Sequence, residues 1–173
     1  MTAAVVLRPL DHDDLEPVAA IEAEGSPDPW PRSLFAAELE VAPARRHWLV
    51  AVAGAEGPVI GFGGVMYTAD EAHLMNLGVR PGWRGRRIAQ LLCCGLVDEA
   101  RRRGAAGLTL EVRASNGPAI ALYEKLTMRP AGRRVRYYPD GEDAVIYWLH
   151  GLDRSAVGAL VDRLRSEAAG VRA

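Results

Sequence analysis

Hydrophobic and polar positions follow two different periods along the chain. In the N-terminal half of the chain, three apolar runs follow one another with short polar or glycine-containing links between them, as is typical of consecutive strands. These runs are His47–Ala53, Val59–Tyr67 and Ala72–Val79. We expect them to form an antiparallel meander, although three glycines weaken the second run. Val5–Leu7 predicts a short strand before the meander.

Apolar positions spaced three and four residues apart predict helices elsewhere. The first begins after Asp11 and Asp14, whose spacing resembles a helix-start signal, and ends near Glu24. Others are expected over Ser33–Glu40, Ile88–Gly104 and Gly117–Leu126. Residues 153–173 either add a helix or form a frayed tail.

The order of elements predicts the fold class. Leu108–Val112 reads as an apolar strand, and strand, helix and strand over residues 74–112 imply a parallel crossover. Arg133–Tyr138 and Ala144–His150 predict a final hairpin across Asp140-Gly141. The sequence thus predicts an α+β domain with a mixed sheet of about seven strands and about four flanking helices. We assign the domain to residues 1–152 and a C-terminal extension to residues 153–173.

The composition of the chain excludes several classes of protein. The chain has 173 residues, is 49% hydrophobic and 25% charged, and therefore has enough apolar material for one core without disulfide or metal support. No apolar run approaches the roughly 20 residues of a membrane span, and the N-terminus lacks signal-peptide features. The adjacent Cys93 and Cys94 favour a reducing cytoplasm. The histidines lack metal-ligand spacing, and the scattered aromatic residues make no platform for nucleic acid.

Charge is divided unevenly between the two halves. Residues 1–79 contain 4 basic and 12 acidic side chains, out of 21 basic and 22 acidic in the whole chain. The first half therefore suits a cationic partner and the second an anionic one. The alternative is two solvated faces that happen to differ.

The loop Gly82–Arg87 is the sharpest local feature, because it is basic, contains glycine and enters the long helix. Free backbone N–H groups and the positive dipole at a helix start bind phosphate, and glycine permits close approach. A solvated basic turn is the alternative, and spacing alone favours it somewhat. The loop matches neither a Walker motif nor the dinucleotide fingerprint.

Three polar residues gather around the predicted crossover. Glu111 alternates with the apolar Leu108, Leu110 and Val112, so a carboxylate there is either a base or an ion-pair partner of a neighbouring strand. Asn116 is placed to cap the following helix, which carries Tyr123. Each has an ordinary structural explanation, but their grouping beside one crossover makes a site more plausible.

Several motifs resemble a known family. The stretches Asn76–Pro81 and Arg84–Leu92 resemble the acetyl-CoA motif of the GNAT superfamily of N-acetyltransferases. Further stretches resemble its RimI-like branch, the ribosomal-protein alanine N-acetyltransferases; they are Asp28–Trp30, Leu110–Asn116, Ala119–Glu124, Arg136–Pro139 and Asp143-Ala144. The resemblance spans roughly residues 5–149 and implies acetyl transfer from acetyl-CoA, without a metal, to a protein N-terminus.

The resemblance also implies roles for particular residues. The backbone of Leu77, Gly78 and Val79 would pair with the pantetheine arm, and the Val79 N–H would polarise the thioester carbonyl. Asn116 would hydrogen-bond the cofactor. The pyrophosphate would be held at the helix start by Arg84, Gly85, Arg86, Arg87, Ile88, Ala89 and Gln90.

Catalysis and acceptor binding follow from the same resemblance. Glu111 would deprotonate the α-ammonium, whose ordinary pKa is about 7.7–8.0, and Tyr123 would protonate the departing thiolate. Trp30, Tyr137 and Tyr138 would line the slot for the peptide. The acidic first half would attract the basic tail of a ribosomal protein, with no membrane and no direct nucleic-acid contact expected.

The chain departs from the family pattern at two positions. Arg87 replaces a usual glycine, which predicts retained but altered affinity for the cofactor. Thr127 replaces the glycine that usually ends the helix in a left-handed conformation. Threonine resists this conformation at a cost of about 1–2 kcal/mol, so the helix is expected to end differently and to shift Tyr123.

Three functions stay open at this point. The first is an acetyltransferase for protein N-termini, and the second is a relative that acetylates a small amine such as an antibiotic or polyamine. The third is a module that binds acyl-CoA without catalysis, which the two departures favour and the presence of both Glu111 and Tyr123 disfavours.

Overall fold

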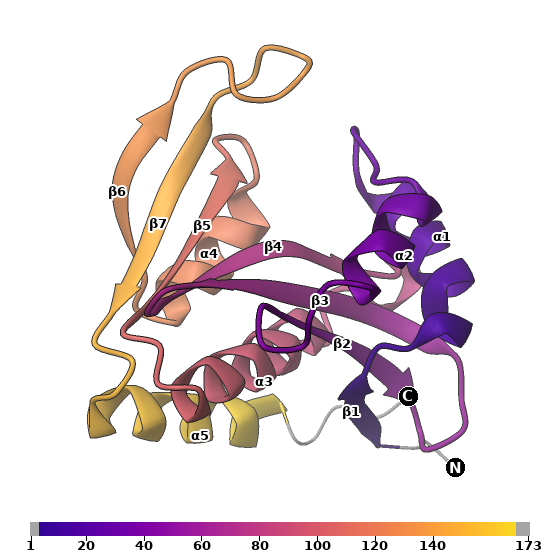
Figure 1. Cartoon of the computed structure of the whole chain (residues 1–173), viewed down its shortest axis with the longest axis horizontal. Coiled ribbons are helices and arrows are strands. Elements are labelled where there is room, and N and C mark those ends of the chain that lie inside the picture. The colour runs from indigo at the N-terminus through magenta and orange to yellow at the C-terminus, as the bar shows by residue number, and fades with distance from the viewer. Residues whose placement is uncertain (1–3, 169–173) are drawn as a thin grey trace.

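The chain folds around one mixed sheet of seven strands in the order β1-β2-β3-β4-β5-β7-β6 (Figure 1). The computed structural model describes residues 4–168. Every neighbouring pair is antiparallel except β4 and β5, which run parallel. The strands are β1 Val5–Pro9, β2 Arg46–Ala53, β3 Val59–Thr68, β4 Glu71–Val79, β5 Gly107–Arg113, β6 Arg129–Arg134 and β7 Ala144–His150.

Helices cover both faces of this sheet and create two cores. On one face, α1 and α2 bury Val18, Ile21 and Phe35 against strand residues that include Val50 and Phe62. On the other face, α3, α4 and α5 contribute to a larger apolar cluster. The helices are α1 Leu15–Gly25, α2 Arg32–Leu39, α3 Ile88–Arg102, α4 Gly117–Lys125 and α5 Ser155–Ala168. The predicted α+β fold, the meander and the parallel crossover are confirmed.

The parallel strands β4 and β5 pair only at their beginnings and then separate. The pairing covers Glu71–His73 of β4 and Gly107–Thr109 of β5. Just beyond it, Gly64 of β3 pairs with Asn76 and Val65 with Leu74, so Met75 is an extra residue on β4. A bulge of this kind bends a strand and increases its twist. The result is a fork between β4 and β5 that opens toward the C-terminal ends of both strands (Figure 1).

A glycine in β3 makes room for the aromatic core rather than breaking the strand. A Cβ atom at Gly64 would lie 2.2 Å from the ring of Trp48, which crosses the backbone there. The Trp48 ring packs edge-on against Phe35, with 5.8 Å between centroids. The strand therefore runs over all of Val59–Thr68 despite its glycines.

The first strand of the final hairpin lies earlier in the sequence than predicted. The edge strand β6 covers Arg129–Arg134, so the prediction of a strand over Arg133–Tyr138 is wrong at its C-terminal part. All six residues of β6 are exposed, and such a strand carries no apolar alternation that marks its position in the sequence. Tyr137 and Tyr138 consequently lie in the loop between β6 and β7.

The end of α4 contradicts another prediction. Thr127 adopts the left-handed conformation, with φ of +62°. The Met128 N–H donates to the Tyr123 carbonyl at 3.0 Å and the Thr127 N–H to that of Glu124 at 2.9 Å, the pattern of a Schellman motif. The expectation that threonine changes the helix end is therefore wrong. Burial of Met128 and Leu126 holds the turn in place despite the strained residue.

Of the two alternatives left open for residues 153–173, the described part forms a helix, α5, which packs on α3 (Figure 1). Val157, Leu160, Val161 and Leu164 are buried in the larger core, while residues 169–173 lie outside the described part. The division at residue 152 stays a prediction. Within residues 4–168, no helix is both long and apolar enough to cross a membrane.

Candidate active site

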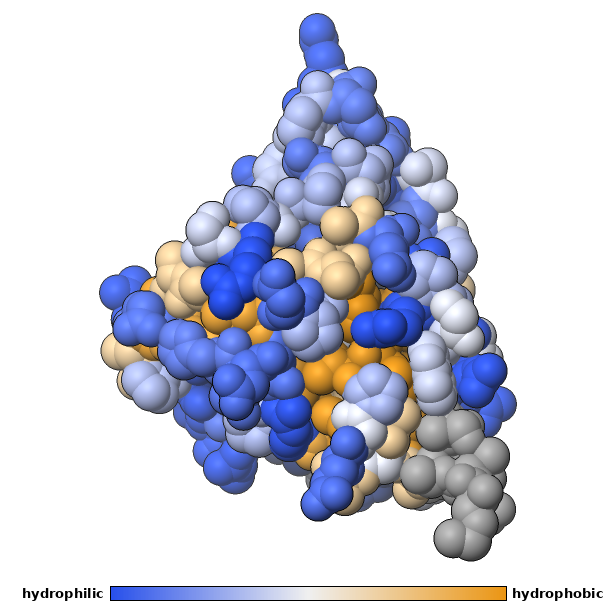
Figure 2. All heavy atoms as spheres, turned by 90° about the vertical axis from the view of Figure 1, so that its right-hand side faces the viewer, coloured by the Kyte–Doolittle hydropathy of each residue, from blue (hydrophilic) through white to orange (hydrophobic). Residues whose placement is uncertain are grey.

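A cleft of about 780 Å³ occupies the fork between β4 and β5. Its walls come from β4, the start of α3, β5, α4 and the segment after α1. Figure 2 views the molecule from the side on which α1 and α2 lie, and it shows recessed apolar surface among polar side chains. A cleft with apolar walls and a few polar groups is the usual form of a small-molecule site.

The open edge of β4 forms one wall of the cleft. Leu77, Gly78 and Val79 all line it. The Arg80 N–H donates to the Ile60 carbonyl of β3 at 2.9 Å. Because successive N–H groups of a strand point to opposite sides, the Val79 N–H is directed toward the fork, where β5 has separated. The β4 edge can therefore accept an extended ligand as an additional strand.

The start of α3 presents a basic turn to the cleft. Gly85 and Arg87 both have left-handed backbones, with φ of +74° and +59°. Of the seven residues predicted to hold pyrophosphate, Arg84, Gly85, Arg87, Ile88, Ala89 and Gln90 line the cleft. Arg86 is not among the lining residues and stacks over Trp83 at 4.9 Å. The turn thus offers unpaired helix-start N–H groups and cationic side chains to an anion.

The side chain of Arg87 connects this turn to the end of α5. Its guanidinium donates to the Glu167 carbonyl. Buried Gln90 donates to the Leu164 carbonyl at 2.7 Å and accepts from Lys125 at 3.0 Å. Lys125 also binds Glu167 at 2.9 Å and lowers the pKa of that carboxyl. The residue that replaces the usual glycine therefore fixes the C-terminal helix against the helix start.

Glu111 lies on the face of β5 opposite the buried Leu108, Leu110 and Val112, as its alternation predicts. Its side chain is 12% exposed and faces the cleft. One carboxylate oxygen lies 2.6 Å from His73 Nε2 of β4, and the other accepts from Arg134 Nε of β6 at 3.2 Å. A carboxylate has further lone pairs, so Glu111 can still accept a proton from the cleft.

Tyr123 lies on α4, and Asn116 immediately precedes that helix. Tyr123 is 6% exposed and lines the cleft. Burial raises the pKa of its hydroxyl well above the ordinary value, so the group is protonated at neutral pH. Asn116 also lines the cleft, and its side chain caps α4 by accepting from the Ala119 N–H at 3.2 Å.

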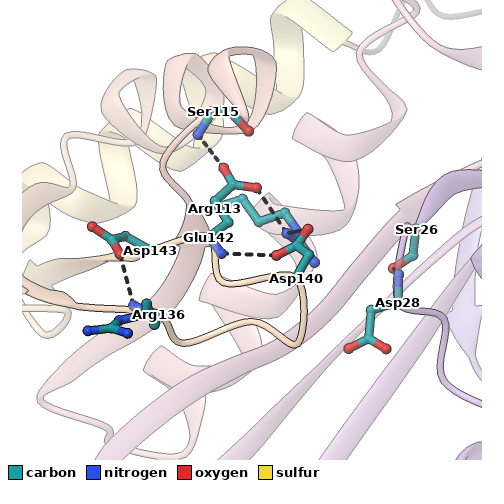
Figure 3. Close-up of polar contacts among 8 residues, drawn as sticks. All are labelled: Ser26, Asp28, Arg113, Ser115, Arg136, Asp140, Glu142 and Asp143. Carbon is teal, nitrogen blue, oxygen red and sulfur yellow. Dashed lines mark hydrogen bonds and ion pairs between the residues drawn. The ribbon is translucent and has the colours of Figure 1, made fainter.

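The loop between β6 and β7 borders the cleft at the end away from α3. Arg113, at the end of β5, binds Asp140 at 2.8 Å and Glu142 at 2.9 Å, and Glu142 accepts from the Ser115 N–H at 2.8 Å. Figure 3 shows these contacts, with Ser26 and Asp28 on the facing segment after α1. Acidic groups thus stand on both sides of this end of the cleft.

The structure brings two of the three predicted acceptor residues to the cleft. Trp30 and Tyr138 line it, and Tyr138 is held over the Arg113 guanidinium at 4.0 Å. Tyr137 does not line it but packs edge-on against Tyr138, with 5.1 Å between centroids. Tyr137 can therefore act only through its neighbour in this arrangement.

Sequence reasoning missed two residues of the site, Glu22 and His73. Glu22 is buried in the cleft wall, where desolvation raises its pKa and the Trp30 N–H donates to it at 3.1 Å. Its position four residues after Val18 places this carboxylate on the apolar face of the first helix, and that position could have marked Glu22 as a buried polar residue. His73 had no such signal, because its partner Glu111 is 38 residues away in sequence.

Comparisons with known proteins agree with this geometry. Residues 15–128 match the model of the acetyltransferase (GNAT) family. The chain belongs to the GNAT family. The ribosomal protein bS18-alanine N-acetyltransferase of Escherichia coli is 37% identical over 140 residues, which cover 79% of this chain and 91% of that protein. The N-alpha-acetyltransferase RimI of Mycobacterium tuberculosis is 33% identical over 150 residues, covering 83% and 90%.

Solved structures extend the likeness to three dimensions. The crystal structure of the Escherichia coli enzyme superposes with a TM-score of 0.76 at 36% identity and covers 84% of this chain and 93% of that one. Arabidopsis thaliana NAA60 in complex with acetyl-CoA has the same fold, with a TM-score of 0.74 at 22% identity over 84% and 98% of the two chains. The predicted family and enzyme class, an N-acetyltransferase, are confirmed.

Metal ligands do not gather in the part of the GNAT chain that the structure describes. Among residues 4–168, no group of three His, Cys, Asp or Glu side chains is arranged to hold a metal ion. Cys93 and Cys94 are buried free thiols, and burial raises the pKa of Cys94 to about 11. Neither cysteine faces the cleft.

Proposed function

We propose that this GNAT chain transfers the acetyl group of acetyl-CoA to the α-amino group of a ribosomal protein N-terminus. The observation that carries the proposal is the fork itself, in which one cleft meets a free strand edge, a basic helix start, Glu111 and Tyr123. The Escherichia coli relative, named a bS18-alanine N-acetyltransferase, supports the acceptor class. Ribosomal proteins are made in the cytoplasm, so we expect the reaction there.

The donor site follows from the chemistry of the lining residues. Leu77 to Val79 would hold an amide-containing arm along the β4 edge, with the Val79 N–H aimed at the carbonyl to be attacked. The N–H groups at the start of α3, with Arg84 and Arg87, would hold a diphosphate. Bound acetyl-CoA supplies the acetyl thioester.

The reaction needs one proton acceptor and one proton donor. Glu111 would take a proton from the acceptor α-ammonium, through water, and leave a neutral amine. Nitrogen then forms its bond to the carbonyl carbon as the carbon–sulfur bond breaks. The Tyr123 hydroxyl, protonated at neutral pH, would donate to the departing sulfur, and the second proton that nitrogen loses on becoming an amide would pass through water to restore the hydroxyl. No covalent intermediate on the protein is required.

The acceptor would enter between the segment after α1 and the loop between β6 and β7. Trp30 and Tyr138 provide apolar walls there, and Asp28 adds a negative charge to the lining, whereas Asp140 and Glu142 share the cation Arg113. A cationic peptide terminus is attracted to such a site.

A single assay separates the proposed function from a small-amine acetyltransferase and from a binding module. Release of free CoA is measured with peptides that carry N-terminal sequences of ribosomal proteins, with polyamines and aminoglycosides, and without acceptor. We expect turnover with peptides alone. Turnover with amines alone, or calorimetric binding of acetyl-CoA without any turnover, would contradict the proposal.

Replacement of the proposed base tests the mechanism. Glu111→Gln should lower kcat by about 100-fold or more, because positioned general bases contribute about 10²–10⁴-fold. The loss should be greatest at low pH, where the acceptor amine is protonated and its proton must be removed. Glu16→Gln, on the exposed face of α1, is the matched control. A pH–rate profile that Glu111→Gln leaves unchanged would remove Glu111 as the base.

A further inference from the structure

His73 and Glu111 form a hydrogen-bonded pair across the branch point of the fork. His73 lies in the last residue pair that joins β4 to β5, opposite Thr109. Glu111 is two residues further along β5 and therefore on the same face as Thr109. The His73 Nε2 atom lies 2.6 Å from the Glu111 carboxylate, and the two side chains are 28% and 12% exposed. The pair thus joins the two strands at the point where the cleft begins.

The two members of the pair face different surroundings. Glu111 lines the cleft, whereas His73 is not among its lining residues and contacts Glu111 from behind. Arg134 holds the other carboxylate oxygen. His73 therefore acts on an acceptor in the cleft through Glu111, whose orientation and charge environment it can control.

The effect of His73 on Glu111 depends on whether the imidazole is neutral or protonated. A neutral imidazole donates its Nε2–H to the carboxylate and fixes the carboxylate plane without adding charge. A protonated imidazole places a full positive charge against the carboxylate. An adjacent cation favours the ionised form of a carboxyl group and makes it a weaker proton acceptor.

We propose that His73 is a positioning residue for acetyl transfer, which aligns Glu111 when neutral and suppresses its basicity when protonated. The proposal rests on the proposed function, because it assigns Glu111 the role of base. It predicts an acid limb of the kcat profile that depends on the presence of an ionisable side chain at position 73.

Other charged groups near His73 define the controls. His73 is paired across the strands with Met66 of β3, and Met66 with Arg46 of β2, which forms an ion pair with Glu38 of α2. Two residues away on the same face of the sheet, Glu71 of β4 and His150 of β7 both flank Gly107 of β5. His150 stacks on Trp148, with 5.1 Å between ring centroids. The charged or titratable groups that face the pair are Arg46, Glu71, Arg134, Tyr138 and His150.

The test compares kcat against pH for the wild type, His73→Gln, His73→Ala, His73→Met and His150→Gln with one alanine-starting peptide. The Gln amide keeps a donor near the Nε2 position but cannot become charged. We expect His73→Gln to retain kcat within threefold at pH 8 and to move the acid limb down by at least one pH unit. His73→Ala should lose at least tenfold at pH 8 and less at low pH, where the wild type is itself suppressed, and His150→Gln should match the wild type.

The outcomes separate this proposal from the function on which it rests. An acid limb that stays in place in His73→Gln, or that moves in His150→Gln, would overturn the role of His73. Titration of the peptide amine contributes equally to every variant and cannot produce such a difference. A wild-type protein that acetylates no peptide would instead overturn the proposed function. Recovery of activity in His73→Gln relative to His73→Met, which fills similar space without a donor, excludes a purely space-filling role.

Discussion

Thr127 is a residue whose replacement should make the protein more stable. It occupies the left-handed position that ends α4, at φ of +62°, where a side chain crowds the following carbonyl. This crowding costs about 1–2 kcal/mol in residues other than glycine. Thr127→Gly removes the crowding and keeps both backbone hydrogen bonds of the turn. Because Thr127 is exposed, the substitution gives up little buried surface.

The expected gain is smaller than the strain, because glycine also raises the entropy of the unfolded chain. That opposing effect is roughly 0.5–1 kcal/mol. The free energy of unfolding should therefore rise by about 0.5–1 kcal/mol. For a domain of this size, 1 kcal/mol corresponds to about 2–4 °C, so Tm should rise by about 1–4 °C.

Urea and thermal unfolding followed by circular dichroism would measure this gain. Thr127→Ala is one control, since it keeps the Cβ atom and should change the free energy of unfolding by less than about 0.5 kcal/mol. Ala121→Gly on the exposed face of α4 is the other, and it should destabilise by about 1 kcal/mol. If Thr127→Gly proves no more stable than Thr127→Ala, left-handed strain at this position is refuted.

Three further substitutions test other parts of the structure. Arg87→Gly removes a cation from the start of α3 and its contact with Glu167. Calorimetry should therefore give a several-fold weaker Kd for CoA at low salt and a smaller difference at high salt. Identical Kd values for the two proteins would exclude a role for the Arg87 side chain. Leu164→Ala should lower the free energy of unfolding in urea by about 2–5 kcal/mol, whereas a loss below about 1 kcal/mol would mean that α5 is no part of the core. Gly64→Ala should cost about 1–3 kcal/mol in the same assay, since its Cβ meets the Trp48 ring, and wild-type stability would show that the ring moves aside freely.

Much of the fold was determined by local sequence. Apolar periods gave the meander, the long helix α3 and the strand β5, because which face a residue occupies depends only on its spacing from its neighbours. The capping of α4 by Asn116 and the start near Asp11 and Asp14 depend on contacts within a few residues. The stretches Asn76–Pro81 and Arg84–Leu92 indicated the family by their resemblance to its acetyl-CoA motif.

Tertiary structure decided what depends on distant partners. Edge strand β6 takes its register from β7 and not from its own exposed residues, so Tyr137 and Tyr138 were assigned to the wrong element. Thr127 is held left-handed by packing that its local preference opposes. The contact of His73 with Glu111 and the attachment of Arg87 to α5 join segments 38 and 80 residues apart. Such contacts form only after the sheet has set its register, and no local pattern specifies them.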